Sequence, residues 1–328
     1  MTGGDGVEDI TGTAVLRATL CGRVTVTGHG SVLGPRELGG TKPRHILIAL
    51  LLRAGQPVTK ARLVEALWGD APPSGATGTL EGYVSLLRKR IEPLHPGQDS
   101  PVRTVPGGYL ADPSLVEVDV ERFRALVAAA RRPGNPPTRA LVDYAAGLLL
   151  VEGGLVPDEL APSWLEEERR AHAALVGKVV VEAGMLALDA DQPVLAEHWA
   201  RRALDRDAFD ETAWRVLLES LEVRGLHADG VRAYDTCRRL FDRELGCAPG
   251  PGIRAAFSRL LAGTRGDDGG LGSLLQAVLR VHAELSPPPL RSVERTGDAT
   301  GLEEACRALD ALIATARHRC GLRVASSA

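Results

Sequence analysis

The chain has 328 residues, of which 44% are hydrophobic and only 4% aromatic, and its formal net charge is −3. This length predicts about two domains. No run of about 18 apolar residues predicts a membrane-spanning helix. Residues 1–12 are acidic and lack the basic and apolar regions of a signal peptide, so we expect a disordered leader. These features predict a cytoplasmic protein with no membrane partner.

The five cysteines and eight histidines show no reactive or metal-binding pattern. The cysteines are odd in number and widely spaced, with no CxxC pair, which indicates a reducing compartment and buried free thiols. The histidines occur one at a time, and no phosphate-binding loop, HExxH or GxSxG motif is present. The sequence therefore predicts no catalytic residue, no metal site, no cofactor and no enzymatic activity.

Charge is unevenly distributed along the chain. Residues 13–112 contain 12 basic and 7 acidic residues, a net charge of +5, whereas the rest of the chain is acidic. Such an asymmetry is expected when only one domain of a protein meets a nucleic acid.

The basic region reads as a small sheet, three helices and a hairpin. Residues 13–39 alternate in short β-prone runs between glycine turns, which predicts an antiparallel sheet. Capping residues and apolar periodicity then predict three helices, at 43–53, 60–68 and 75–92. Two short strands follow around a Pro-Gly-Gly turn, at 102–105 and 109–111.

The helix predicted at 75–92, GATGTLEGYVSLLRKRIE, has two different faces. Its apolar stripe, suited to burial, consists of Leu80, Tyr83/Val84, Leu87 and Ile91. The opposite face carries small residues, and three cations gather at its C-terminal end. Small residues allow a helix to approach a surface closely, and clustered cations favour an anionic surface. An ordinary surface helix with a basic end would show the same pattern.

In element order and in sequence, this region resembles the OmpR/PhoB-type winged helix, in the form found in the Streptomyces antibiotic regulatory protein family. The resemblance is carried by LGGTKPRHILIALLLRAGQPVTKARLVEALWGD, by TLEGYVSLLRKRIEP and by VRTVPGGYLA. It implies that the third helix enters the major groove of double-stranded DNA. It also implies that the hairpin, or wing, contacts the neighbouring backbone.

The resemblance also implies a set of DNA-binding residues. Positions that would read bases hold Thr77, Thr79, Gly82 and Leu86. Positions that would face phosphates hold Lys42, Arg44, Trp68, Tyr83, Ser85, Arg88, Lys89, Thr104 and Tyr109. For Trp68, Tyr83 and Tyr109, a packing role is the alternative.

This sequence departs from the family pattern at several of these positions. Leu86 replaces a long polar residue, Thr77 and Gly78 replace Arg or Asn, and Pro106 replaces a wing cation. A bidentate arginine–guanine contact, worth about 1–3 kcal/mol, is then missing at these positions, although Leu86 could touch a thymine methyl group. We expect DNA binding that is weaker than usual in the family or dependent on a dimer.

From Asp119 onward the pattern is uniformly helical, with Asp119 expected to cap the first helix and residues 113–120 expected to form a linker. This block resembles the bacterial transcriptional activation domain of the same family. The resemblance is carried by VDVERFRALVAAAR, PSWLEEERRAHAALV, ADGVRAYDTCRRLFDREL and GCAPGPGIRAAFSRLL. It implies a tetratricopeptide-like helical domain that helps to recruit RNA polymerase, through its sigma or alpha subunit, and that forms a homodimer.

The predicted fold class is mainly α with a small β component. The predicted parts are a disordered leader, a winged-helix DNA-binding domain, a tetratricopeptide-like all-α domain, a linker and a helical tail of unknown role, at 1–12, 13–112, 113–262, 263–273 and 274–328. The predicted function is a sequence-specific DNA-binding transcriptional regulator, an activator that recruits RNA polymerase at promoters of secondary-metabolism type. The alternative is a protein-interaction or ligand-sensing module whose winged helix has lost strong base readout.

Overall fold

The computed structural model describes residues 16–97, 99–158 and 162–263. The chain divides into two compact units, Met1–Ala208 and Phe209–Ala328. The predicted leader, the predicted linker from residue 264 and the predicted tail at 274–328 lie outside the described residues.

The first unit begins with a four-stranded sheet in the order β3-β2-β1-β7. Its first three strands are antiparallel, as predicted: β1 (Leu16–Thr19), β2 (Thr25–Gly28) and β3 (Ser31–Leu33). The fourth strand, β7 (Val116–Val118), pairs parallel with β1 and comes from the segment that was expected to be a linker. The expectation was wrong because a three-residue Val-Glu-Val alternation is too short to distinguish from a linker.

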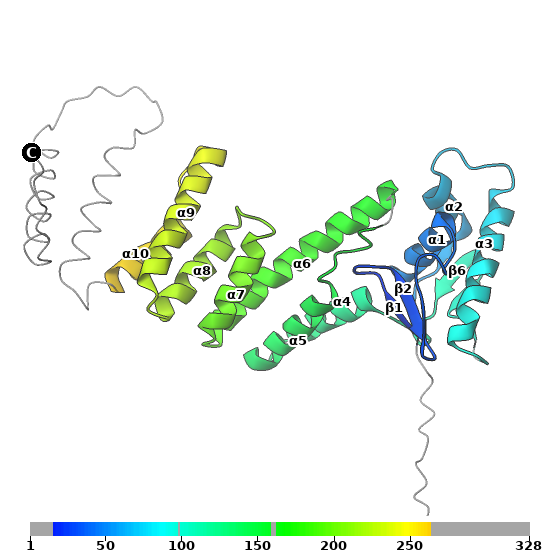
Figure 1. Cartoon of the computed structure of the whole chain (residues 1–328), viewed down its shortest axis with the longest axis horizontal. Coiled ribbons are helices and arrows are strands. Elements are labelled where there is room, and N and C mark those ends of the chain that lie inside the picture. The colour runs from blue at the N-terminus through cyan, green and yellow to red at the C-terminus, as the bar shows by residue number, and fades with distance from the viewer. Residues whose placement is uncertain (1–15, 98, 159–161, 264–328) are drawn as a thin grey trace, which may run out of the picture. The chain divides into compact units, whose positions relative to one another are not determined.

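Three helices and a second sheet form the rest of the winged helix (Figure 1). The helices are α1 (Thr41–Leu51), α2 (Lys60–Trp68) and α3 (Ala76–Ile91), followed by the short 3-10 helix η1 (Glu92–Leu94). The sheet has the order β4-β6-β5, with β4 (Val58–Thr59), β5 (Val102–Val105) and β6 (Gly108–Ala111). The core between these elements is aliphatic, with fully buried Ile46, Ile48, Leu63, Leu80 and Leu87.

Two glycines make the hairpin β5–β6 possible. Gly107 has a φ of +79°, which side chains rarely adopt, and forms the turn. A Cβ at Gly108 would lie 2.1 Å from the carbonyl oxygen of Val58, so only glycine allows β6 to pair closely with β4. The wing is thereby fixed to the start of α2, because the next residues after Val58 lead directly into that helix.

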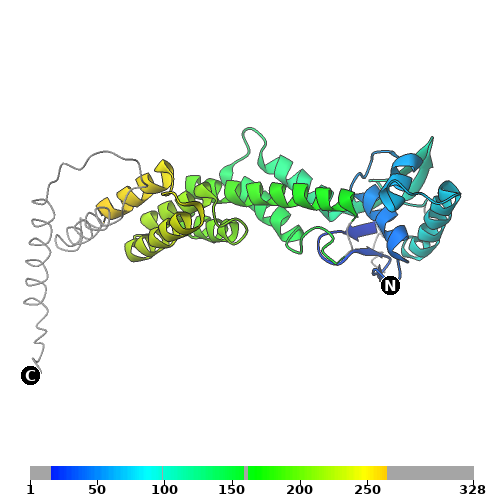
Figure 2. The ribbon, with the colours of Figure 1, turned by 90° about the horizontal axis from the view of Figure 1, so that it is seen from above.

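Four helices complete the first unit (Figure 2). They are α4 (Asp119–Ala130), α5 (Pro137–Leu150), α6 (Ser163–Asp189) and α7 (Pro193–Leu204). Each packs on the next along the chain, which is the nearest-neighbour packing of helical repeats. Their shared core contains Phe123, Tyr144, Val176, Val180 and Trp199.

Asp119 does not cap α4 as predicted. It is the first residue of the helix, and the N-cap residue, Val118, makes no side-chain capping bond. The buried carboxylate of Asp119 instead accepts hydrogen bonds from the backbone N–H groups of Leu20, at 2.9 Å, and Cys21, at 2.8 Å. Asp119 therefore ties the end of β1 to the start of α4.

Helix α6 is 27 residues long, and it is the one helix among the described residues whose length and hydropathy would also fit a membrane span. Its apolar residues are used in packing, since Leu165, Val176, Val179 and Val180 are buried and the helix contacts α5 and α7. The core helix of a helical domain has these same properties, so the length of α6 alone is weak evidence for a membrane.

The second unit contains α8 (Glu211–Val223), α9 (His227–Leu245) and α10 (Pro251–Gly263). Gly230 of α9 lies against Leu260 of α10, whose side chain would be 2.0 Å from an added Cβ, so these two helices pack closely. Cys237 is buried and Cys247 is exposed. The prediction of buried thiols thus holds for Cys21 and Cys237 and is wrong for Cys247, while Cys306 and Cys320 lie outside the described residues.

Candidate nucleic-acid interface

Helix α3 has one buried and one exposed face, which follow the 3.6-residue period. Its buried residues are Ala76, Leu80, Val84, Leu87 and Ile91. Its exposed residues are Thr77, Gly78, Thr79, Glu81, Gly82, Ser85, Leu86 and Lys89, and Tyr83 and Arg88 are half-buried. The exposed face is therefore a thin ridge that ends in a cation.

Two glycines, Gly78 and Gly82, leave the middle of this exposed face without side chains. A Cβ added at Gly78 or Gly82 would meet no atom within 4 Å, so both positions face open space. Glycine inside a helix costs about 1 kcal/mol relative to alanine. Because no close packing in the described fold requires glycine here, the open positions provide room for a surface that approaches α3.

Arg88 joins α3 to the wing. Its Nε donates to the carbonyl oxygen of Val102 at 2.8 Å, and its Nη2 donates to the hydroxyl oxygen of Thr104, also at 2.8 Å. The guanidinium lies 5.8 Å from the ring centre of Tyr109. Tyr109 itself is only 4% exposed. The buried ring of Tyr109 thus packs beneath the guanidinium of Arg88, and Tyr109 is mainly a packing residue.

A second cation lies on an aromatic pair at the other side of the helix. The ammonium nitrogen of Lys42, at the start of α1, is 4.4 Å from the ring centre of Trp68. The Trp68 ring stacks on Tyr83 of α3, with ring centres 6.5 Å apart and an angle of 18°. All three residues are half-buried. This stack holds the end of α2 against α3 and positions Lys42 beside the ridge.

Lys60 was not among the predicted site residues, yet it lies between the helix and the wing. Its ammonium group donates to Glu81 of α3 at 2.6 Å and lies 5.9 Å from the ring centre of Tyr109. The hydrogen bond that Lys60 donates to Glu81 raises the pKa of Lys60. The available signal in the sequence was weak, because Lys60 is simply the residue that follows the cap Thr59.

Two other arginines, Arg44 of α1 and Arg90 of α3, donate hydrogen bonds to backbone carbonyl groups. Nη1 of Arg44 donates to the carbonyl oxygens of Pro35, at 3.1 Å, and Gly39, at 2.7 Å. Nη1 of Arg90 donates to the carbonyl oxygen of Glu37. Both side chains therefore fix the loop that precedes α1. Lys89, by contrast, is exposed and has no ion-pair or hydrogen-bond partner within the described part of the chain.

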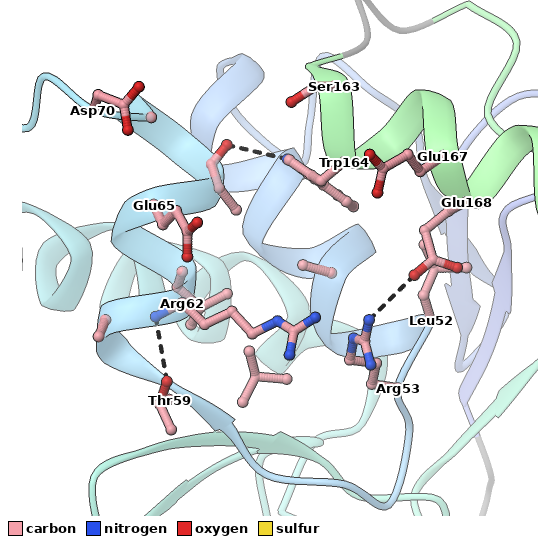
Figure 3. A pocket seen from close by; sticks show the side chains of 16 residues that line it. Leu52, Arg53, Thr59, Arg62, Glu65, Asp70, Ser163, Trp164, Glu167 and Glu168 are labelled. Atoms are coloured by element: carbon pink, nitrogen blue, oxygen red, sulfur yellow. Dashed lines mark hydrogen bonds and ion pairs between the residues drawn. The ribbon is translucent and has the colours of Figure 1, made fainter.

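A separate cavity of about 690 Å³ lies where the N-terminal end of α6 meets α1 and α2 (Figure 3). Nε1 of Trp164 donates to the carbonyl oxygen of Ala66 at 3.1 Å, and Arg53 forms an ion pair with Glu168 at 3.2 Å. These two contacts join the winged helix to the long helix of the following domain. They involve α2 and the turn that follows α1, and the exposed residues of α3 stay uncovered.

A cysteine, a histidine and an aspartate also meet inside the first unit. Sγ of Cys21 lies 3.7 Å from Nε2 of His172, next to Asp119. Burial, with a contribution from Asp119, raises the pKa of Cys21 to about 12, and burial lowers the pKa of His172 to about 4. Both groups are therefore neutral near pH 7. A cysteine nucleophile requires the opposite, a thiolate beside a cation.

Two family models match this chain side by side. The model described as "Transcriptional regulatory protein, C terminal" matches residues 38–111, and the model described as "Bacterial transcriptional activator domain" matches residues 118–261. The first match contains α1 to α3 and the wing, and the second contains α4 to α10 almost completely.

Known proteins that are similar to this chain include two regulators from Streptomyces. Transcriptional regulator RedD of Streptomyces coelicolor is 29% identical over 257 residues, which cover 74% of this chain and 71% of RedD. Regulatory protein AfsR of Streptomyces griseus is 30% identical over 256 residues, which cover 75% of this chain but only 24% of AfsR. A solved structure, Mycobacterium tuberculosis EmbR in complex with a low affinity phosphopeptide, has a TM-score of 0.63 and 22% identity. It covers 82% of this chain and 71% of EmbR, and it supports the fold alone.

A winged helix with an open third helix, followed by a transcriptional activator domain, defines a DNA-binding transcriptional regulator. The chain belongs to the Streptomyces antibiotic regulatory protein family. The fold class, the family and the regulatory function predicted from the sequence are thereby confirmed.

Proposed function

We propose that this regulator is an activator that binds promoter DNA through α3 and recruits RNA polymerase through its helical domain. The supporting observation for DNA contact is the exposed ridge of α3, thinned by Gly78 and Gly82 and followed by the free cation of Lys89. A helix of this shape fits the major groove, which is about 12 Å wide.

In this proposal the predicted residues fall into two groups. Thr77, Thr79, Gly82 and Leu86 face the bases. The phosphates are met by Lys42, Arg44, Trp68, Tyr83, Ser85, Arg88, Lys89, Thr104 and Tyr109, with Arg44 and Tyr109 acting mainly through the loop and the cation that they support. Most of the affinity then comes from phosphate contacts, because they outnumber the base contacts.

The domains and partners of the proposal extend beyond DNA. Residues 13–112 bind the operator, and residues 113–262 contact the sigma or alpha subunit of RNA polymerase and form a homodimer. The match of residues 118–261 to the model described as a bacterial transcriptional activator domain supports the activating role of this part. The protein works in the cytoplasm, without enzymatic activity, at promoters of secondary-metabolism type. The Streptomyces regulators among its relatives favour this setting.

Selection of bound DNA from a random pool by the full chain tests the DNA half of the proposal. We expect a defined operator, retarded in a gel shift, whose affinity falls steeply with salt because bound counterions are released. Absence of any retarded fragment at about 50 mM salt would instead support the alternative of a protein-interaction or ligand-sensing module.

Transcription from purified components tests the activator half. A template that carries the selected operator beside a promoter should give more transcript with RNA polymerase when the full chain is added. A template with a scrambled operator is the matched control. A decrease in transcript on the operator template would show a repressor and overturn the activator assignment.

A further inference from the structure

Apart from Lys89, which the proposed function assigns to a phosphate, the donors that normally read bases from a recognition helix are missing or occupied on α3. The exposed face contains no Asn, Gln or Arg before Arg88. Arg88 is held by Val102 and Thr104 of the wing, and Arg90 is held by the carbonyl group of Glu37. The two-pronged contacts by which Arg reads guanine and Asn or Gln reads adenine are therefore absent from this helix.

The hydroxyl groups on the ridge provide few further hydrogen-bond donors for reading bases. The Thr79 hydroxyl already donates its proton to the carbonyl oxygen of Gly75 at 3.3 Å, so it has no proton left to give to a base. Glu81 could accept from cytosine, but it holds Lys60 at 2.6 Å. Ser85 is the remaining small donor in the middle of the ridge.

Apolar groups, in contrast, are presented along one side of the ridge. Leu86 is 36% exposed, although it is a large aliphatic residue on an outer face. Its Cδ2 atom lies 3.8 Å from the position that a Cβ on Gly39 would take, so the side chain lies beside the turn that precedes α1. Thr79, seven residues earlier, lies on the same side of α3 after two helical turns.

We propose that this regulator reads its operator through the C5-methyl groups of thymine, contacted by Leu86 and by the methyl group of Thr79. The proposal rests on the proposed function, namely that α3 enters the major groove. Thymine is the base that presents a methyl group there, and apolar side chains recognise it by contact. Seven residues of helix rise by about 10 Å, which matches about three base pairs. The expected operator thus carries thymines about three base pairs apart.

Modified bases test this proposal without changing the protein. The selected operator is synthesised in three forms, with natural bases, with deoxyuridine in place of thymine, and with 7-deazaguanine in place of guanine. Deoxyuridine lacks only the methyl group, and 7-deazaguanine lacks the N7 acceptor that arginine uses. We expect about fourfold weaker binding for each contacted methyl group that is removed, and a change of less than twofold for 7-deazaguanine.

A double-mutant cycle separates direct contact from an effect of the methyl groups on DNA shape. The variant Leu86→Ala should bind the natural operator more weakly and should lose the fourfold share of the deoxyuridine effect that belongs to Leu86, while it keeps the share that belongs to Thr79. The variant Ser85→Ala, at the residue directly before Leu86, should keep the full sensitivity to deoxyuridine. Thermal unfolding of both variants checks that the fold is retained.

The outcomes distinguish this inference from the proposed function. A selected operator that binds equally well with thymine and with deoxyuridine overturns the inference but leaves DNA binding by α3 intact. The same holds if deoxyuridine weakens wild type and Leu86→Ala to the same degree, or if 7-deazaguanine causes the larger loss. Failure to select any operator overturns the proposed function instead.

Discussion

The guanidinium of Arg88 on α3 and the hydroxyl group of Thr104 on β5 are joined by a hydrogen bond of 2.8 Å, although the two residues belong to the helix and the wing respectively. The same guanidinium also donates to the backbone of Val102. The angle between the recognition helix and the wing is therefore set before DNA is bound, and less ordering is needed on binding.

This relationship predicts a loss of affinity when the bond is removed. Thr104→Val keeps the shape of the side chain but removes the acceptor, and we expect about threefold to tenfold weaker operator binding, since a net hydrogen bond is worth about 0.5–1.5 kcal/mol. Combined with Arg88→Ala, the loss should be less than additive. Thr236→Val, on α9 of the second unit, is the control. Unchanged affinity in Thr104→Val would contradict the role of this bond.

The open glycines of α3 predict that added bulk should block DNA binding without harming the fold. We expect Gly82→Glu to abolish operator binding in a gel shift, because the new side chain and its charge would fill the space kept for the groove. Thermal stability should be unchanged or higher, since nothing lies within 4 Å of the new Cβ and glycine is a poor helix former.

Gly177→Glu is a matched control for this experiment. Gly177 lies inside α6, and a Cβ there also meets nothing within 4 Å. The control variant should bind the operator like wild type. If both variants bind equally well, α3 does not enter a groove in the way proposed.

The free ammonium group of Lys89 predicts a change in salt dependence. Removing one phosphate contact should lower the slope of log K against log salt by about 0.9 for B-DNA. We therefore expect Lys89→Ala to bind more weakly at low salt on every sequence and to show this shallower slope in fluorescence anisotropy. Lys178→Ala, which removes an exposed lysine of α6, should leave the slope unchanged. A similar slope in wild type and Lys89→Ala would argue against the contact.

Burial of His172 predicts that stability falls in mild acid. The pKa of His172 is lowered from 6.5 to about 4 by burial, with smaller effects of Arg124 and Arg206. Below pH 6.5 the imidazole of His172 is protonated in the unfolded chain but stays neutral in the folded chain. The free energy of unfolding therefore decreases between pH 6.5 and about 4. The decrease is about 3 kcal/mol at most.

Urea unfolding at pH 7 and pH 5 measures this effect. The variant His172→Gln should lose less stability than wild type between the two pH values, whatever its stability at pH 7. The raised pKa of the neighbouring Asp119, caused by burial, acts in the opposite sense at low pH and is common to both proteins. An identical pH dependence in wild type and variant would contradict the assignment.

Much of the fold could be predicted because its signals are local. Helix α2 has the predicted bounds because the cap Thr59 and the stop Gly69 both lie next to it. The two faces of α3 follow directly from the spacing of its apolar residues. Strand β7 and the role of Asp119 could not be predicted, because both depend on pairing with β1, about 100 residues away in sequence.

The site could be predicted in outline and less well in detail. The positions on α3 follow from helical spacing, and the exposure of Ser85 and Lys89 agrees with that spacing. The bonds of Arg88 to the wing, the pair of Lys60 with Glu81 and the burial of Tyr109 depend on distances between separate elements. Periodicity contains no information on such distances.

Strand β7 has a practical consequence for anyone who wishes to cut the protein into parts. The N–H of Leu16 donates to the carbonyl oxygen of Leu115, and β7 covers the outer side of β1. A DNA-binding fragment that ended at residue 112 would lack β7 and would expose the unpaired backbone groups of β1. Exposed edge strands pair with other chains and cause aggregation. A fragment intended to stay monomeric must therefore continue through Asp119.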